Sequence, residues 1–189
     1  MNAKRMSKFF SVLCLFSIGS VATAAPTVGF DNSNISVKVG DIFSVNVIGN
    51  DFLADVDGGG FNLLFNKALL KIDSITVLTS LWEFLPQNGT INNAEGSASE
   101  IQFNTFAHHN NGTFNIASLQ FTALSAGIGQ LNLSESVNNP FASGGLALNP
   151  TFLAGSVKVT SAVPLPGALW LMMSSLGALG LMGRKNKQS

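Results

Sequence analysis

Three aspartates in one short stretch are the most concentrated set of ligand atoms in the sequence. Asp51, Asp55 and Asp57 lie within seven residues, and Gly58-Gly59-Gly60 follows them. Several carboxylates on a flexible loop could coordinate Ca²⁺, although their spacing is not that of an EF-hand. The alternative is a solvated acidic turn that leads into a strand at Phe61. We assign no metal to these residues and expect no cofactor.

The remaining titratable residues do not form a catalytic set. Glycoside hydrolysis requires two carboxylates that face each other across a cleft, and nothing in the sequence selects such a pair. His108 and His109 are adjacent, so on a strand they would point in opposite directions, and we expect them on a hairpin loop before Asn110. A G-x-S-x-G nucleophile elbow is also missing from the sequence. We therefore expect a protein that is not an enzyme, with these carboxylates on its surface: Glu83, Glu95, Glu100 and Glu135.

Two aromatic residues are candidates for contact with a sugar. Trp82 and Phe84, followed by Pro86, could form an exposed platform on which a sugar ring stacks. The alternative for such residues is burial at the end of a strand.

Apolar residues alternate with polar ones along most of the chain, which predicts half-buried strands. Glycine and asparagine turns separate these segments, and no long helical pattern interrupts them. The fold class predicted is all-β, an antiparallel β-sandwich of eight or nine strands. The segments are residues 35–39, 43–47, 61–66, 71–78, 101–103, 117–121, 131–133 and 157–159, with a ninth at 28–30.

Three segments of this alternating region resemble the cohesin domain. They are 39–45 (VGDIFSV), 60–70 (GFNLLFNKALL) and 111–123 (NGTFNIASLQFTA), the last followed by Ser125-Ala126-Gly127. Asn66-Lys67 stands where cohesins usually have Asp-Pro. The resemblance covers nearly all of residues 28–160 and implies a nine-stranded jelly-roll sandwich, a fold related to a group of carbohydrate-binding modules. It implies a module for interaction with another protein or a polysaccharide.

The N-terminal residues have the pattern of a secretory signal peptide. Lys4, Arg5 and Lys8 precede a short apolar segment at 9–18, and Ala22-Thr23-Ala24 forms a small-residue cleavage site. We expect signal peptidase to cut after Ala24, so that residues 1–24 are removed and the mature chain begins at Ala25. The only cysteine, Cys14, is lost with this segment, and disulfides and thiol chemistry are thereby excluded.

The C-terminal residues have the pattern of a single membrane span. Leu165 to Gly183 is an uncharged run of 19 residues, close to the length of helix that crosses a hydrocarbon core about 30 Å thick. Pro164 and Pro166 mark its beginning, so we expect a transmembrane helix over about 167–183. Trp170 suits an interfacial position.

A basic cluster follows this span at 184–187, namely Arg184, Lys185 and Lys187. Basic residues beside a span stay on the cytoplasmic side, so the rest of the chain is expected outside. The order of Val163-Pro164-Leu165-Pro166, apolar helix and basic cluster resembles the PEP-CTERM sorting tail of exported Gram-negative proteins, with Leu165 in place of the family's Glu. The resemblance implies recognition by an exosortase and cleavage near the proline motif. The alternative is a plain anchor that is not cut.

These boundaries divide the chain into a signal peptide (1–24), one ectodomain (25–163) and a sorting tail (164–189). The ectodomain has four lysines and ten carboxylates, a net charge of −6, which argues against nucleic acid as a partner. We expect an exported protein, anchored in the inner membrane as a precursor and later at the cell surface or extracellular. Its expected role is interaction in the exopolysaccharide or biofilm layer. A carbohydrate-binding module and a secreted glycoside hydrolase are the alternatives.

The signal peptide gives a direct prediction. Signal peptidase accepts only small side chains before the cut, so Ala24→Asp should block processing while the wild-type mature chain begins at Ala25. N-terminal sequencing of both proteins tests it, and a wild-type sequence that begins elsewhere contradicts it.

Overall fold

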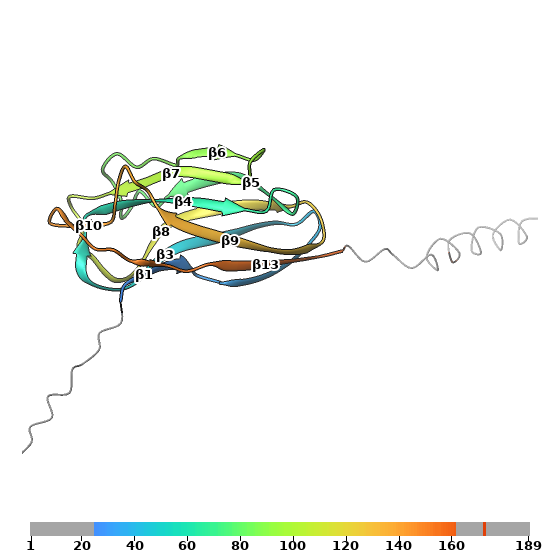
Figure 1. Cartoon of the computed structure of the whole chain (residues 1–189), viewed down its shortest axis with the longest axis horizontal. Coiled ribbons are helices and arrows are strands. Elements are labelled where there is room, and N and C mark those ends of the chain that lie inside the picture. Colours follow the sequence, from blue (N-terminus) through green and yellow to red (C-terminus); the bar gives the residue numbers. More distant parts are fainter. Residues whose placement is uncertain (1–24, 162–171, 173–189) are drawn as a thin grey trace, which may run out of the picture.

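A computed structural model describes residues 25–161 and Met172 of this chain. The predicted signal peptide lies outside these residues, as does the sorting tail apart from Met172. The described residues form two β-sheets that pack face to face (Figure 1). The strands are β1 (Thr27–Phe30), β2 (Asn34–Lys38), β3 (Ile42–Val56), β4 (Gly58–Phe65), β5 (Leu70–Val77), β6 (Thr90–Asn92), β7 (Ser97–Asn104), β8 (Asn110–Ala123), β9 (Gly127–Glu135), β10 (Ala142–Ser143), β11 (Leu146–Ala147), β12 (Thr151–Phe152) and β13 (Gly155–Thr160).

The first sheet has the strand order β12-β1-β3-β8-β5. The second has the order β11-β10-β4-β9-β13-β2, and β7 pairs with both β4 and β6. Most pairs are antiparallel, as predicted, but β1 with β12 and β13 with β2 are parallel. The expectation of a purely antiparallel sandwich is therefore wrong at these two pairs. Both involve strands that are distant in sequence, and alternation within a segment carries no information about the direction of its partner.

The prediction of an all-β sandwich is confirmed, but residues 25–161 contain thirteen strands where eight or nine were predicted. Nine strands of the described chain have four or more residues, and each contains or overlaps one of the predicted segments. The four others have three residues or fewer, too short for alternation to be detected. The main difference is the length of β3, which extends to Val56, whereas the predicted segment ends at residue 47.

The core consists of side chains that point from both sheets into the space between them. On β8, Leu119 and Phe121 are fully buried while Gln120 between them is exposed, which is the expected period of two. The Phe121 ring stacks on Phe43 with centroids 5.5 Å apart, and it meets Phe65 edge-on at 5.9 Å. Aromatic pairs of this kind link β3, β4 and β8 across the core.

The three consecutive glycines are not part of a loop. Gly58, Gly59 and Gly60 are the first three residues of β4 and are buried. A Cβ on Gly58 would lie 2.2 Å from Asn104 Oδ1, and a Cβ on Gly59 would lie 2.8 Å from the Phe141 ring. The glycines thus allow the side chains of Asn104 and Phe141 to lie directly against the backbone of β4.

No helix within residues 25–161 is long and apolar enough to cross a membrane. The predicted span over 167–183, like the basic cluster, falls almost entirely on residues that the structure does not describe.

The faces of β8 give a stability prediction. Phe121→Ala should lower the free energy of unfolding by about 3 to 5 kcal/mol, because it removes a buried aromatic side chain from the core. Gln120→Ala is the matched control on the neighbouring exposed position and should change stability by less than about 0.5 kcal/mol. Chemical denaturation of the two variants tests this, and equal effects would contradict the assignment of the two faces.

Candidate binding site at the distal end

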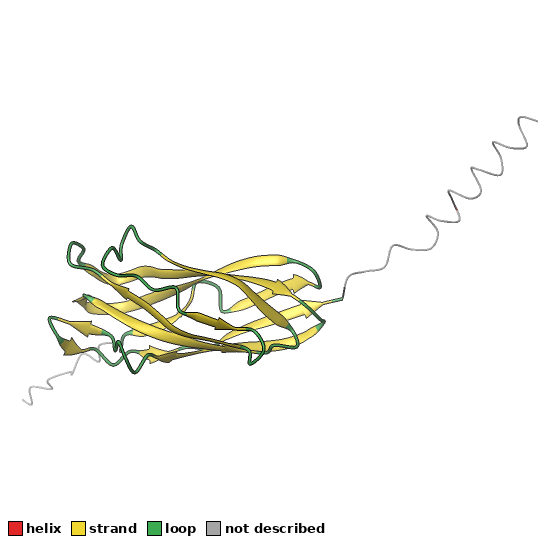
Figure 2. Cartoon of the chain, turned by 90° about the horizontal axis from the view of Figure 1, so that it is seen from above, coloured by secondary structure: helices red, strands yellow, loops and turns green. Residues whose placement is uncertain are grey.

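The strands run along the long axis of the sandwich, so the loops gather at its two ends (Figure 2). Strand β13 leads to one end, which is next to Gly127 and Val39. We call the opposite end the distal end. It is formed by Asp57 and by three segments, 78–86, 105–109 and 136–145. Backbone hydrogen bonds and strand pairing connect these segments to the beginning of β4. The chain also enters the domain there, because Thr27 pairs with Asn50.

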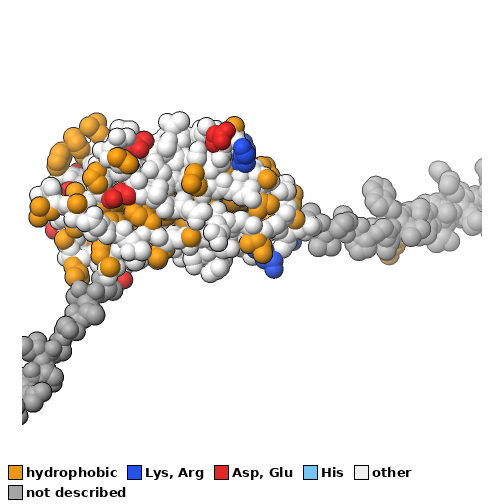
Figure 3. Space-filling model, viewed as in Figure 1, with side chains coloured by type: hydrophobic (Ala, Val, Ile, Leu, Met, Phe, Trp, Pro, Cys, Tyr) orange, Lys and Arg blue, Asp and Glu red, His pale blue; other side chains and the backbone are white. Residues whose placement is uncertain are grey.

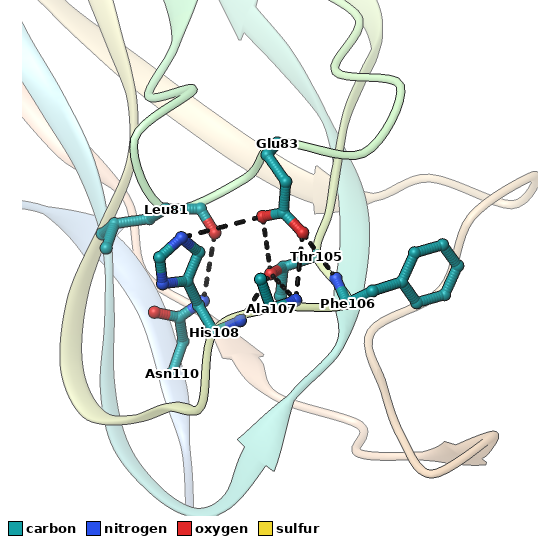
Figure 4. A network of polar contacts seen from close by, with 7 residues as sticks. All are labelled: Leu81, Glu83, Thr105, Phe106, Ala107, His108 and Asn110. Atoms are coloured by element: carbon teal, nitrogen blue, oxygen red, sulfur yellow. Dashed lines mark hydrogen bonds and ion pairs between the residues drawn. The ribbon is translucent and has the colours of Figure 1, made fainter.

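A single carboxylate organises the 105–109 segment. Glu83 accepts hydrogen bonds from Thr105 Oγ1 at 2.7 Å, from Phe106 N at 2.7 Å and from Ala107 N at 3.0 Å (Figure 4). Thr105 Oγ1 in turn accepts from His108 N at 3.0 Å. Glu83 therefore holds the backbone of a segment that connects β7 in one sheet with β8 in the other.

The same hydrogen bonds change the acidity of Glu83. The backbone N–H of Phe106 and the hydroxyl of Thr105 stabilise the carboxylate and lower the pKa of Glu83 from its ordinary value of 4.5 to about 2, against a smaller opposing effect of burial. Glu83 therefore remains an anion, and keeps these hydrogen bonds, at pH values at which an ordinary glutamate is already protonated.

The two histidines take part in different contacts. His108 Nε2 lies 3.9 Å from Glu83 Oε2, and His109 Nδ1 lies 2.8 Å from Asp55 Oδ2. The two side chains thus contact different carboxylates. The histidines lie in a loop directly before Asn110, as predicted, but this loop is not a hairpin, because β7 and β8 belong to different sheets.

The structure separates the three aspartates. Asp51 and Asp55 lie within β3, where the pairing with β8 is irregular, and Asp57 is the single residue between β3 and β4. Asp55 Oδ1 accepts from Asn111 Nδ2 at 2.6 Å, and Asp57 Oδ2 accepts from Gly144 N. The prediction that the three aspartates share one acidic loop is therefore wrong, because two of them lie in a strand. Within residues 25–161, no three or more acidic or histidine side chains gather so as to hold a metal ion.

Two further glutamates, Glu100 and Glu135, also accept structural hydrogen bonds. Ser136 Oγ donates to Glu100 Oε2 at 2.7 Å, and this bond is the main reason that the pKa of Glu100 is lowered. Glu135 Oε1 accepts from Phe141 N at 2.9 Å. The general acid of a glycosidase requires a raised pKa, so the lowered pKa values of Glu83 and Glu100 are unsuited to that role.

Only one of the two predicted aromatic residues is available to a ligand. Trp82 is fully buried, packs edge-on against Phe103 and Phe114, and donates from Nε1 to Asn115 O at 2.9 Å. Of the two alternatives, burial is confirmed for Trp82 and the exposed platform is wrong, because the ring packs in the core and its one donor is satisfied there. Phe84 is 39% exposed, and its ring centroid lies 4.3 Å from that of Phe106.

Phe106 is the functional candidate that the sequence did not single out. Its side chain is 82% exposed, and Figure 4 shows its ring directed away from the Glu83 network. The signal in the sequence is a single large apolar residue between Thr105 and the polar run that begins at His108. Such an isolated residue is usually core, and only the structure shows that it faces solvent.

A shallow pocket of about 290 Å³ lies beside the two rings. Its walls combine apolar and polar groups: Asp57, Gly58, Phe84, Asn104, Thr105, Phe106, Asn139, Pro140, Ala142 and Gly145. Asn139 Nδ2 donates to Asn104 Oδ1 at 3.1 Å and to Gly59 O at 2.8 Å, which fixes both amides. In the described chain, Asn104 Nδ2, Asn139 Oδ1 and Asp57 Oδ1 make no hydrogen bond and remain available to a ligand.

Comparison with known proteins identifies the class of fold. No family model matches the sequence, and no curated protein matches it. Solved cohesin structures do match the fold. The type I cohesin–dockerin complex Coh-OlpC-Doc435 of Clostridium thermocellum contains a chain with 10% identity and a TM-score of 0.61, covering 73% of this chain and 95% of that one.

Two further structures agree with this match. The cohesin module of a family 33 glycoside hydrolase from Clostridium perfringens has 13% identity and a TM-score of 0.58, covering 73% of this chain and 97% of that one. The cohesin CaCohA2 of Clostridium acetobutylicum has 17% identity and a TM-score of 0.54, covering 71% of this chain and 91% of that one. Residues 25–161 thus have the cohesin-like sandwich fold that the sequence resemblance implied.

The Glu83 network gives a pH prediction. A carboxylate with a lowered pKa in the folded state stabilises that state above its unfolded pKa, and the contribution is lost as the pH falls through the folded pKa. The protection of the Phe106 and Ala107 amides against hydrogen exchange should therefore be the same at pH 7 and pH 5. It should fall as the pH drops from 4.5 towards 2.

Glu83→Gln should reduce the protection of the same two amides several-fold already at pH 7, because hydrogen bonds to a charged acceptor are the stronger kind. Glu95→Gln is the control, since the Glu95 side chain is exposed and accepts no hydrogen bond in the described chain. Hydrogen exchange followed by NMR measures both, and equal protection in the two variants would contradict the role of Glu83.

Proposed function

We propose that this chain is an exported, surface-sorted interaction protein that acts without catalysis in the extracellular matrix or exopolysaccharide layer. The observation that carries the proposal is a cohesin-like sandwich placed between a signal-peptide pattern and a PEP-CTERM-like tail. Signal peptidase and an exosortase-like enzyme process the chain, and the C-terminal helix holds the precursor in the inner membrane. Another surface protein or an exopolysaccharide is the partner of the sandwich.

The fold supports a protein partner, because one of the solved structures with this fold is a cohesin in complex with a dockerin. The lowered pKa values of Glu83 and Glu100 support the non-catalytic role. The position of the distal end also supports an interaction role. It lies opposite the end to which β13 leads, so the precursor, while its C-terminal helix holds it, presents the distal end outward (Figure 1).

A carbohydrate-binding module is the second candidate. The specific observation in its favour is the exposed pair of rings, Phe84 and Phe106, beside a pocket with unsatisfied amide and carboxylate atoms.

The proposal that the tail is a sorting signal is tested by measuring whether the tail is cut. Replacing Pro164 and Pro166 with Ala should leave the protein in the membrane and uncut, because the helix could then extend through the cleavage region. Replacing Arg184, Lys185 and Lys187 with Gln should weaken the orientation of the span, because insertion depends on basic residues close to it. The measurement is the mature mass of each variant in a host with an exosortase and in one without.

The wild-type protein should lose its tail only in the host with the enzyme. If the wild type keeps its tail in both hosts, the chain has a plain anchor and the sorting proposal fails.

A further inference from the structure

We propose that the distal pocket binds a neutral pyranose unit of a polysaccharide, with Phe106 as the stacking residue. The proposal rests on the interaction role proposed above but not on export or sorting. Its evidence is the combination of exposed rings, free polar atoms and local charge at this end of the domain.

The first argument is the presentation of the ring. A solvent-exposed phenyl group on a loose loop would lose conformational freedom on binding, which costs affinity. The Phe106 backbone N–H instead donates to Glu83 at 2.7 Å, and the flanking Thr105 and Ala107 are tied to the same carboxylate. Phe84, directly next to Glu83 in sequence, supports one side of the ring at 4.3 Å. The platform is therefore largely formed before any ligand arrives.

The second argument is the match between the pocket and the two chemical characters of a sugar. A pyranose has an apolar C–H face, which suits a phenyl ring, and hydroxyl groups at its rim. Asn104 Nδ2 offers a donor, and Asn139 Oδ1 and Asp57 Oδ1 offer acceptors. The volume of about 290 Å³ lies at the lower limit for small-molecule pockets, so it suits one ring and leaves the rest of a polymer in solvent.

The third argument is charge. The four lysines of residues 25–161 lie toward the opposite end. In the strand register, Lys38 lies opposite Thr160, Lys158 opposite Ile128 and Lys71 opposite Thr122. The fourth, Lys67, donates a hydrogen bond to Ala94 O. Figure 3 shows Lys side chains toward the end at which β13 finishes, and hydrophobic side chains protruding at the other. Asp55, Asp57 and Glu83 make the distal end negative, so uronate, sulfate or phosphate groups would be repelled there.

The test uses the full-length protein in neutral detergent and affinity electrophoresis in gels that contain a neutral galactomannan, a neutral β-glucan or, as the anionic probe, alginate. The wild type should be retarded by at least one neutral polymer and not by alginate. Phe106→Ala should weaken the association by about tenfold. Ile128→Ala, which truncates a side chain that is 71% exposed away from the distal end, should have no effect.

Two further variants separate stacking from general hydrophobic contact. Phe106→Trp keeps a flat ring and should retain binding, while Phe106→Leu keeps an apolar side chain without a ring and should lose it. Unchanged melting temperatures show that these exposed substitutions leave the fold intact.

No retardation of the wild type by either neutral polymer would overturn the proposal, as would equal binding of alginate or equal binding by Phe106→Leu. The last result would show that general apolar contact, and not stacking on a ring, holds the polymer. The processing of the tail in the two hosts is measured independently, so failure of the sugar site is distinguishable from failure of the export and sorting proposal.

Discussion

The distal end depends on how the chain passes from one sheet to the other at Asp57. Only this residue separates β3 from β4, and these strands belong to different sheets. Its N–H donates to Ala142 O at 2.9 Å, its carbonyl accepts from Thr105 N at 2.8 Å, and its carboxylate accepts from Gly144 N. One residue thus fixes the positions of the 105–109 and 142–145 segments, and these form two walls of the proposed pocket.

The glycines that follow explain why this passage is so compact. The beginning of β4 has no side chains of its own, so Asn104 and Phe141 approach its backbone from neighbouring segments. Asn104 then lies where its amide contributes to the pocket, and the buried Phe141 anchors the segment on the core side. A side chain at Gly58 would displace Asn104, so the packing of β4 and the geometry of the pocket have the same cause.

Much of the fold was predictable because alternation directly reports which residues face the core. Phe121 and Gln120 are examples in which pattern and burial agree. The site was less predictable, because exposure depends on contacts between segments that are far apart in sequence. Trp82 is buried because Phe103 and Phe114 surround it, and Phe106 is exposed because Glu83 binds its backbone 23 residues away. Nothing near either aromatic residue in the sequence distinguishes these outcomes.

The charge of the domain differs between its two ends. The net charge of −6 suggests a uniformly acidic surface, yet the lysines lie toward the end where β13 finishes and the distal end has none. Binding at the distal end by an uncharged ligand would depend little on salt, because such a ligand has no net charge whose interaction salt could screen. Ring contact and hydrogen bonds would then supply the affinity. An uncharged ligand is also the kind that an acidic surface does not repel, so the same charge distribution allows a neutral polymer to bind and excludes anionic ones.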